Sequence, residues 1–183
     1  MNFRTVTEKL LTSFKEQQIP YALIGGYAVG LWGVARGTVD MDFLVRREDL
    51  EKLDRIMAAL GYELRYRSEN VSQYMASQAL FGEIDFLHAF RAPTLRMLER
   101  AGEKTIFSEV LSVRVLQPED LIGLKIQAIA NNENRELTDM YDIEELLRLH
   151  GDTLDWKLIE EYCVIFDRED LFAKLKEKYH AVQ

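Results

Sequence analysis

The chain has 183 residues, of which 48% are hydrophobic, and a formal net charge of -8 at pH 7. This length suits one domain of ordinary size or two small lobes, and the apolar content excludes a largely disordered chain. The negative charge argues against a general nucleic-acid coat protein, which would be basic. An acidic protein that handles phosphates needs a metal ion or a focused cationic site to offset the repulsion.

Other features of the composition indicate a cellular compartment. The sequence has no long uncharged apolar run, so we expect no membrane span. Residues 1–20 have the pattern of a charged amphipathic helix and lack the apolar region and cleavage site of a signal peptide. Cys163 is the single cysteine and cannot form an internal disulfide. These features predict a protein of the reducing cytoplasm.

Hydrophobic periodicity and turn residues predict alternating helices and strands in the N-terminal part of the chain. In chain order we expect a helix over 5–18, a strand over 21–25, a Gly-Gly turn with a short helix to residue 33, a strand over 38–45, a helix over 47–61, strands over 62–67, 72–80 and 82–90, a helix over 93–101, and a hairpin over 104–117 with its turn near Ser108 and Glu109.

From Pro118 onward the pattern is helical, with helices expected over 118–131, 135–150, 155–166 and 168–180. The predicted fold class is therefore α+β. Residues 1–117 form an α/β lobe with a mixed sheet flanked by helices, and residues 118–183 form a helical lobe packed against it.

Two aspartates lie one residue apart in the strand expected over 38–45. Asp40 and Asp42 share one face of that strand, whereas Val39, Met41 and Phe43 point to the other. Two neighbouring carboxylates repel each other, and each favours protonation of the other. A divalent cation relieves this repulsion, and carboxylate oxygens suit Mg²⁺.

A third aspartate, Asp85, lies in the strand expected over 82–90. If this strand neighbours the first, Asp85 can face the same point, and Glu83 is either a substitute for it or a residue at the rim. Three such aspartates are the ligand set of a two-metal phosphoryl-transfer site. The Gly25-Gly26 turn lets backbone amides approach phosphate oxygens, but its spacing matches neither a Walker loop nor a dinucleotide fingerprint.

The Gly-Gly turn, the "DMD" strand and the later acidic strand together resemble the signature of the DNA polymerase beta-like nucleotidyltransferase superfamily. The segments "ARGTVDMD", "PEDLIGLKIQA" and "RELTDMYDIEELL" resemble its small bacterial branch, which includes abortive-infection toxins and aminoglycoside or lincosamide nucleotidyltransferases. The resemblance covers about residues 20–147. One departure is Thr138, where the branch often has lysine, so a phosphate contact from that position is in doubt.

The resemblance implies roles for individual residues of the N-terminal lobe. Gly25 and Gly26 would hold the triphosphate of an NTP such as ATP, and Asp40 and Asp42 would bind two Mg²⁺ or Mn²⁺ ions. Asp85 would be the third ligand or the base that takes the acceptor's proton.

Four further residues gain roles in the same way. Arg36 and Thr38 would contact phosphate or orient Asp40, and an ion pair is the other role open to Arg36. Lys125 is either a phosphate-binding charge or a solvated helix residue. Asp139 and Asp142 would be structural and pair with Arg135, Lys125 or the turn.

The predicted function is metal-dependent transfer of a nucleoside monophosphate from an NTP to a hydroxyl of an RNA end, a protein or a small molecule. The acidic net charge favours a small or protein acceptor, whereas the resemblance to toxins favours RNA or protein. The alternative is a nucleotide-binding protein or toxin–antitoxin partner, paired with an antitoxin, that does not catalyse. A phosphatase or nuclease is a third alternative, which the Gly-Gly turn disfavours.

Overall fold

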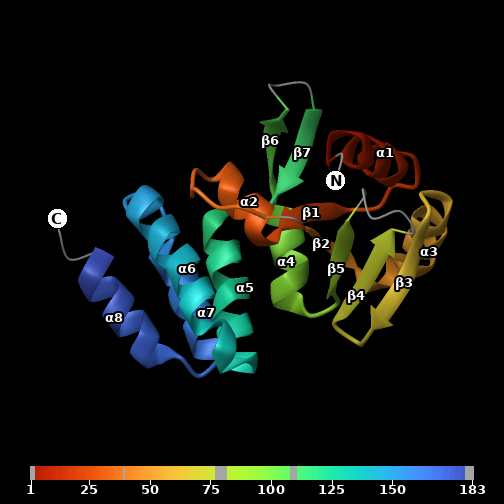
Figure 1. Cartoon of the computed structure of the whole chain (residues 1–183). Helices are drawn as coiled ribbons and strands as arrows, with labels where there is room; N and C mark the ends of the chain where they lie inside the picture. Colours follow the sequence, from red (N-terminus) through yellow and green to blue (C-terminus); the bar gives the residue numbers. More distant parts are fainter. Residues whose placement is uncertain (1–2, 39, 77–81, 108–110, 180–183) are drawn as a thin grey trace. The chain divides into compact units, whose positions relative to one another are not determined.

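The computed structural model describes residues 3–38, 40–76, 82–107 and 111–179 (Figure 1). The chain divides into two compact units, which are described separately. The first consists of Met1–Ala28 and Arg36–Leu116, and the second of Val29–Ala35 and Gln117–Gln183.

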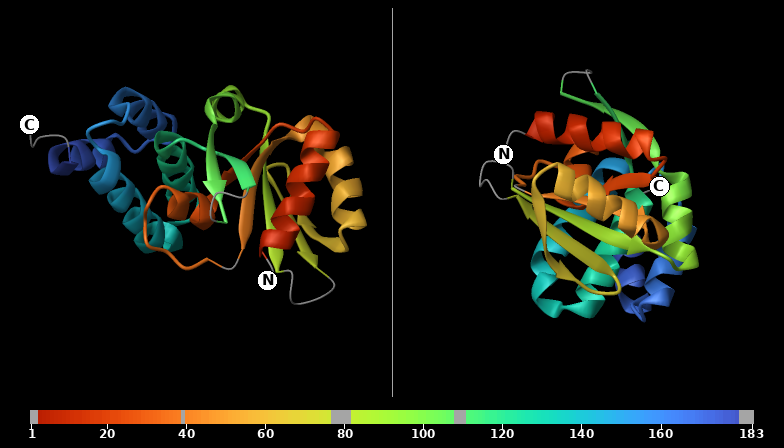
Figure 2. Two further views of the ribbon diagram at one scale, coloured as in Figure 1. Left: turned by 90° about the horizontal axis from the view of Figure 1, so that it is seen from above. Right: turned by 90° about the vertical axis from the view of Figure 1, so that its right-hand side faces the viewer.

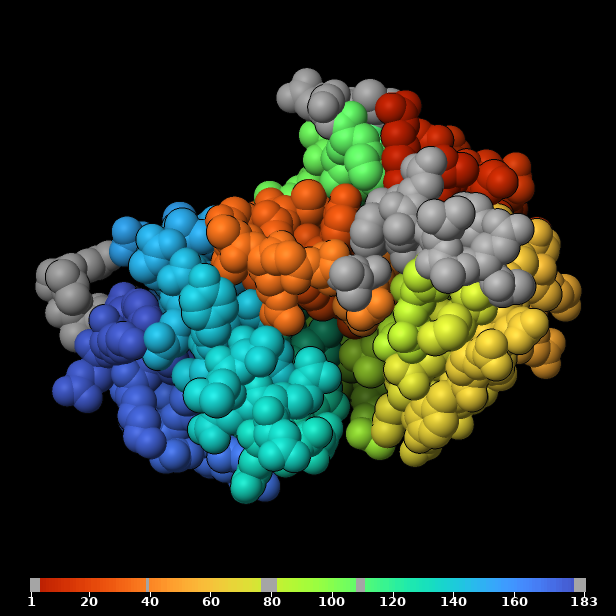
Figure 3. Space-filling view, in the orientation of Figure 1, coloured from red at the N-terminus to blue at the C-terminus, as the bar shows by residue number. Residues whose placement is uncertain are grey.

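The first unit is built on a seven-stranded mixed sheet with the strand order β3-β4-β5-β2-β1-β7-β6. β2 pairs in parallel with β5 and β1 pairs in parallel with β7, whereas the other neighbours are antiparallel. The strands are β1 (Tyr21–Ile24), β2 (Met41–Arg46), β3 (Tyr62–Arg67), β4 (Val71–Ala76), β5 (Glu83–Ala89), β6 (Gly102–Ile106) and β7 (Leu111–Val115). β3 is an edge strand, and most of its residues are exposed, as is visible in yellow in Figure 3.

Helices flank this sheet (Figure 2). They are α1 (Phe3–Glu16), the short helix η1 (Arg47–Asp49), α3 (Leu50–Ala59) and α4 (Ala92–Arg100). α1 has buried apolar residues at helical spacing, among them Val6, Leu10 and Phe14. Helix α2 (Gly25–Leu31) begins in the first unit, directly after β1.

An aromatic cluster forms the core on one face of the sheet. The ring of Phe14 from α1 lies 5.9 Å from that of Phe43 on β2, and Phe43 stacks on Phe86 of β5 at 5.7 Å. All three side chains are buried. Because side chains alternate along a strand, the residues between them on β2 and β5 point to the opposite face.

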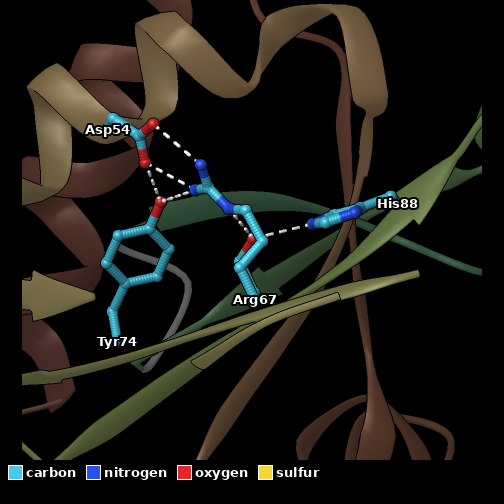
Figure 4. Close-up of polar contacts among 5 residues, drawn as sticks. Asp54, Arg67, Tyr74 and His88 are labelled. Atoms are coloured by element: carbon cyan, nitrogen blue, oxygen red, sulfur yellow. Dashed lines mark hydrogen bonds and ion pairs between the residues drawn. The ribbon is translucent and has the colours of Figure 1, made fainter. Parts of the chain in front are cut away.

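Polar side chains from α3 and three strands form a hydrogen-bonded network on the aromatic face (Figure 4). Arg67 contacts both carboxylate oxygens of Asp54, at 3.0 and 2.6 Å, and its Nε donates to Ser72 Oγ at 2.9 Å. The Tyr74 hydroxyl donates to the same carboxylate. Ser72 Oγ also lies 2.8 Å from Nε2 of His88. The hydrogen bond from Arg67, more than any other contact, lowers the pKa of Asp54.

This network joins the neighbouring strands β3, β4 and β5 in one register. A β-bulge shifts the β3–β4 pairing so that Arg67 lies opposite Ser72. The contact between Ser72 and His88 links β4 to β5 in turn. In the resulting register, Gln73 lies opposite Asp85.

The second unit consists mainly of the helices α5 (Pro118–Asn131), α6 (Glu136–His150), α7 (Trp156–Ile165) and α8 (Glu169–Tyr179). Helix α5 packs against α6 and α7, and α7 packs against α8. Asp155 caps α7 by accepting hydrogen bonds from two backbone amides of the first turn. Residues 29–35 join this unit, where Nε2 of His150 donates to the carbonyl of Trp32 at 2.7 Å.

The predicted α+β class is confirmed, with a sheet in the N-terminal part and helices in the C-terminal part. Within the described ranges, no helix is both long enough and apolar enough to cross a membrane. Some sequence predictions lie outside the described residues. They are the orientation of Val39, the end of the strand expected over 72–80, the turn near Ser108 and Glu109, and the last residue of the helix expected over 168–180.

The buried His88 makes stability depend on pH. Its Nδ1 donates to the carbonyl of Glu69 at 2.9 Å, and burial lowers its pKa below the ordinary value of 6.5. The unfolded chain therefore takes up this proton at a higher pH than the folded protein, so the free energy of unfolding falls as the pH drops below about 6.5.

The substitution His88→Gln should remove this contribution. In chemical denaturation between about pH 7 and 5.5, we expect the variant to show a weaker pH dependence than the wild type, by at most about 1.4 kcal/mol per pH unit. An identical pH dependence in both proteins would contradict the assignment.

Candidate functional site

Two carboxylates lie side by side on the sheet face opposite the aromatic core. Asp42 on β2 and Asp85 on β5 are direct partners in the parallel register, and neighbouring strands lie about 4.8 Å apart. Phe43 and Phe86, the next residues along each strand, occupy the core on the other face. The structure thus brings together two aspartates that are far apart in the sequence.

The third predicted aspartate, Asp40, lies just ahead of β2. The sequence predicted a strand over 38–45 that contains Asp40, but in the structure β2 begins at Met41. Burial and the negative charge of Asp40 raise the pKa of Asp85. Burial, the charge of Asp85 and that of Asp40 also raise the pKa of Glu83. The charge of Asp40 therefore acts on both Asp85 and Glu83, and that of Asp85 acts on Glu83.

The two oxygens of Asp85 have different surroundings. Oδ2 accepts a hydrogen bond from Nε2 of Gln73 at 2.9 Å, which partly opposes the rise in pKa. Oδ1 is buried and has no hydrogen-bond partner among the residues that the structure describes. No sequence pattern indicated a role for Gln73, because its position opposite Asp85 depends on the register of two strands.

Only glycine fits at position 25, because the carboxylate of Asp42 occupies the space that a side chain would need. Its φ of +66° lies in the left-handed region, and a Cβ built on it would overlap the carboxylate of Asp42. Gly25 is the first residue of α2, whereas the sequence predicted a turn ahead of that helix. A side chain at this position is thus excluded by both the backbone conformation and the neighbouring carboxylate.

Arg36 and Thr38 lie against Gly26. A Cβ built on Gly26 would lie 3.2 Å from Nε of Arg36 and 3.3 Å from Oγ1 of Thr38. The hydroxyl of Thr38 donates to the backbone carbonyl of Asp40 at 3.2 Å. These contacts bring the predicted phosphate-binding residues of the first unit next to the start of β2.

The donor atoms suit a hard cation, although a complete cage is not formed. In residues 3–38, 40–76, 82–107 and 111–179, no group of three His, Cys, Asp or Glu side chains is placed to hold a metal ion. Carboxylate oxygens are nonetheless the ligands that Mg²⁺ prefers, and the unpartnered Oδ1 of Asp85 is a buried acceptor that a cation would satisfy. The assignment of Asp40 and Asp42 as its companion ligands stays a prediction.

Lys125, in the second unit, is buried in an ion-pair cluster. Its Nζ lies 3.0 Å from Asp139 and 2.5 Å from Asp142, and Arg135 contacts Asp139 at 2.8 Å. Burial would raise the pKa of Asp139, but the hydrogen bond from Arg135 and the charge of Lys125 lower it. The structural pairing predicted for the two aspartates is present, and the alternative of a solvated Lys125 is wrong. Its contact with phosphate stays a prediction.

The mixed sheet followed by C-terminal helices is the α+β fold of the nucleotidyltransferase class. The chain belongs to the family described as "Uncharacterised nucleotidyltransferase", whose model matches residues 1–168. The resemblance predicted from the sequence and the prediction of an enzyme of this class are therefore confirmed. No curated protein sequence matches the chain.

Solved structures show the same fold. The antibiotic-resistance factor ANT(2'')-Ia in solution has a TM-score of 0.64 and 20% identity over 98% of this chain and 99% of that one. A crystal structure of ANT(2'')-Ia in complex with adenylyl-2''-tobramycin has a TM-score of 0.64 and 18% identity over 91% and 98%. The lincomycin-bound lincosamide antibiotic adenylyltransferase LnuA has a TM-score of 0.53 and 16% identity over 75% and 91%. At these identities the likeness concerns the fold alone.

The substitution Gly25→Ala tests the contact with Asp42. A side chain at a positive φ, pressed against a carboxylate, should lower the free energy of unfolding by about 1–3 kcal/mol. Gly37→Ala is the matched control, because a Cβ there meets nothing within 4 Å. Chemical denaturation measures both, and equal stability of the two variants would contradict the geometry.

The substitution Lys125→Met tests the buried cluster. It leaves the carboxylates of Asp139 and Asp142 without their ammonium partner, so urea unfolding should show a loss of about 3–5 kcal/mol. Lys174→Met is the control, because its pair with Asp170 is 3.6 Å long and exposed, and we expect a loss below about 1 kcal/mol. Similar losses in both variants would contradict a structural role for Lys125.

Proposed function

We propose that this protein transfers a nucleoside monophosphate from an NTP to a hydroxyl group and releases pyrophosphate. The observation that carries the proposal is the register of β2 and β5, which pairs Asp42 with Asp85 directly beside Gly25. Two carboxylates placed side by side on one face of the sheet repel each other. A reaction that needs concentrated negative charge to hold divalent cations accounts for them.

In this proposal Asp40, Asp42 and Asp85 hold two Mg²⁺ or Mn²⁺ ions. When bound, the ions supply positive charge to the triphosphate and to the departing pyrophosphate. The ions would offset the repulsion between the carboxylates, which makes binding of the metal–nucleotide complex favourable.

The glycines and the adjacent cation bind the triphosphate. Gly25 and Gly26 have no side chains of their own, which leaves room beside their backbone for Asp42, Arg36 and Thr38. Arg36 supplies a guanidinium whose Nε lies next to Gly26. A guanidinium is suited to phosphate because it presents several donors in one plane. Thr38 holds the backbone at Asp40.

The transfer itself is a displacement at the α-phosphorus. The acceptor's hydroxyl oxygen forms a bond to that phosphorus as the bond to the bridging oxygen of the β-phosphate breaks. The proton of the hydroxyl passes to solvent, and Asp85 serves as a ligand of the divalent ion that would make the hydroxyl easier to deprotonate.

The acceptor is a small molecule or a protein in preference to RNA. The net charge of -8 and the carboxylates around Asp85 repel a polyanion. ANT(2'')-Ia has been solved with an adenylylated tobramycin and LnuA with lincomycin, so both antibiotics are informative first acceptors to test. An RNA end stays in the test as the competing acceptor.

The test is transfer of label from α-³²P-labelled NTPs. The protein is incubated with Mg²⁺, each NTP in turn, and tobramycin, lincomycin, total tRNA or no added acceptor, the last to detect labelling of the protein itself. We expect labelled product from one of these, and a loss of at least about 100-fold in Asp42→Asn and Asp85→Asn. The exposed residue Asp152 provides the control variant, Asp152→Asn, which should keep full activity.

Other outcomes overturn the proposal. Full activity in both Asp42→Asn and Asp85→Asn would show that the carboxylates are not the metal ligands. Mg²⁺-dependent binding of NTP in calorimetry, without transfer to any acceptor, would favour the non-catalytic alternative of a nucleotide sensor or a toxin–antitoxin partner. Absence of NTP binding would exclude both.

A further inference from the structure

Only one of the two carboxylate oxygens of Asp85 has a hydrogen-bond partner among the described residues. Its Oδ2 accepts the hydrogen bond of Gln73 at 2.9 Å, and its Oδ1 is buried without a hydrogen-bond partner among the described residues. A buried carboxylate oxygen normally has a partner, because leaving it unsatisfied costs about 1–3 kcal/mol. Of the two oxygens, Oδ1 is therefore the one that is able to bind a cation or a hydrogen-bond donor.

Contacts on the opposite face of β4 fix the backbone that carries Gln73. It lies opposite Asp85 in the β4–β5 register, and its chain neighbours Ser72 and Tyr74 point to the opposite face. There both take part in the network of Arg67, with Ser72 contacting it at 2.9 Å and Tyr74 at 2.7 Å. Both flanking residues are buried, so the backbone that carries Gln73 is anchored on each side.

We propose that Gln73 is a positioning residue of the transfer reaction, which holds Oδ2 of Asp85 so that Oδ1 is presented to the divalent ion. This inference rests on the proposed function. The amide of Gln73 has no charge of its own, so it fixes the orientation of the carboxylate without neutralising it. Hydrogen-bond partners that orient metal ligands in this way commonly account for 10–100-fold in affinity or activity.

Two substitutions remove the hydrogen bond in different ways. Gln73→Leu replaces the amide with an apolar group of similar size, and Gln73→Asn keeps an amide but shortens its reach. Met75→Leu is the matched control, because Met75 lies two residues further along the same strand on the same face and is 40% exposed. Melting temperatures of all variants establish that each one folds.

The readout that does not depend on activity is the dissociation constant of Mn²⁺, measured by calorimetry on the whole protein. We expect it to rise about 10–100-fold in both Gln73 variants and to stay unchanged in Met75→Leu. With ATP as donor and the acceptor found by the label assay, kcat should fall by a similar factor, whereas the KM for ATP should stay within about twofold.

A double substitution separates positioning from a general structural effect. If Gln73 acts through Asp85, then Gln73→Leu should cause no further loss of Mn²⁺ affinity in the Asp85→Asn background. An equal loss in both backgrounds, or wild-type affinity in Gln73→Leu and Gln73→Asn, overturns the inference.

The same titrations distinguish this failure from that of the proposed function. If Asp85→Asn loses Mn²⁺ affinity and the Gln73 variants do not, the proposed function stands and the role of Gln73 is wrong. If the wild type does not bind Mn²⁺, or Asp85→Asn binds it as tightly as the wild type, the metal assignment fails and the role of Gln73 fails with it.

Discussion

The repulsion between carboxylates on one face of the sheet is the constraint on which the rest of this structure depends. Asp42 and Asp85 are held opposite each other by backbone pairing, and the charge of Asp40 adds to the repulsion. Favourable interactions in other parts of the fold must compensate for the free energy of this repulsion. The stacked rings of Phe43 and Phe86 lie on the reverse of the same two strands and supply the apolar burial that holds them together.

One face of β4 and β5 therefore stabilises the strand register, and the other carries the residues of the candidate site. On one face His88, Ser72 and their partners fix the register through a buried polar network. On the other, the same register places Gln73 against Asp85. A strand alternates its side chains strictly, so an error of one residue in pairing would exchange the two faces. The network on the aromatic face thus protects the geometry of the candidate site.

Sequence patterns predicted the type and order of the elements, because apolar periodicity reports directly on which face is buried. They also predicted that Asp42 and Asp85 share a site. They placed Asp40 inside β2, since periodicity does not show where backbone pairing begins. The contact with Gln73 and the burial of Lys125 were also missed, because periodicity does not show which segments pack against each other. Both depend on registers and packing between segments far apart in the chain.

In the proposed function, Asp42 and Asp85 hold a common divalent ion beside Gly25. The most direct measurement is a crystal structure with Mn²⁺ and a nonhydrolysable NTP analogue, in which anomalous scattering locates the metal. We expect a Mn²⁺ ion about 2 Å from carboxylate oxygens of both Asp42 and Asp85, with Oδ1 as the ligating atom of the latter. A Mn²⁺–nucleotide complex bound without either carboxylate would contradict it.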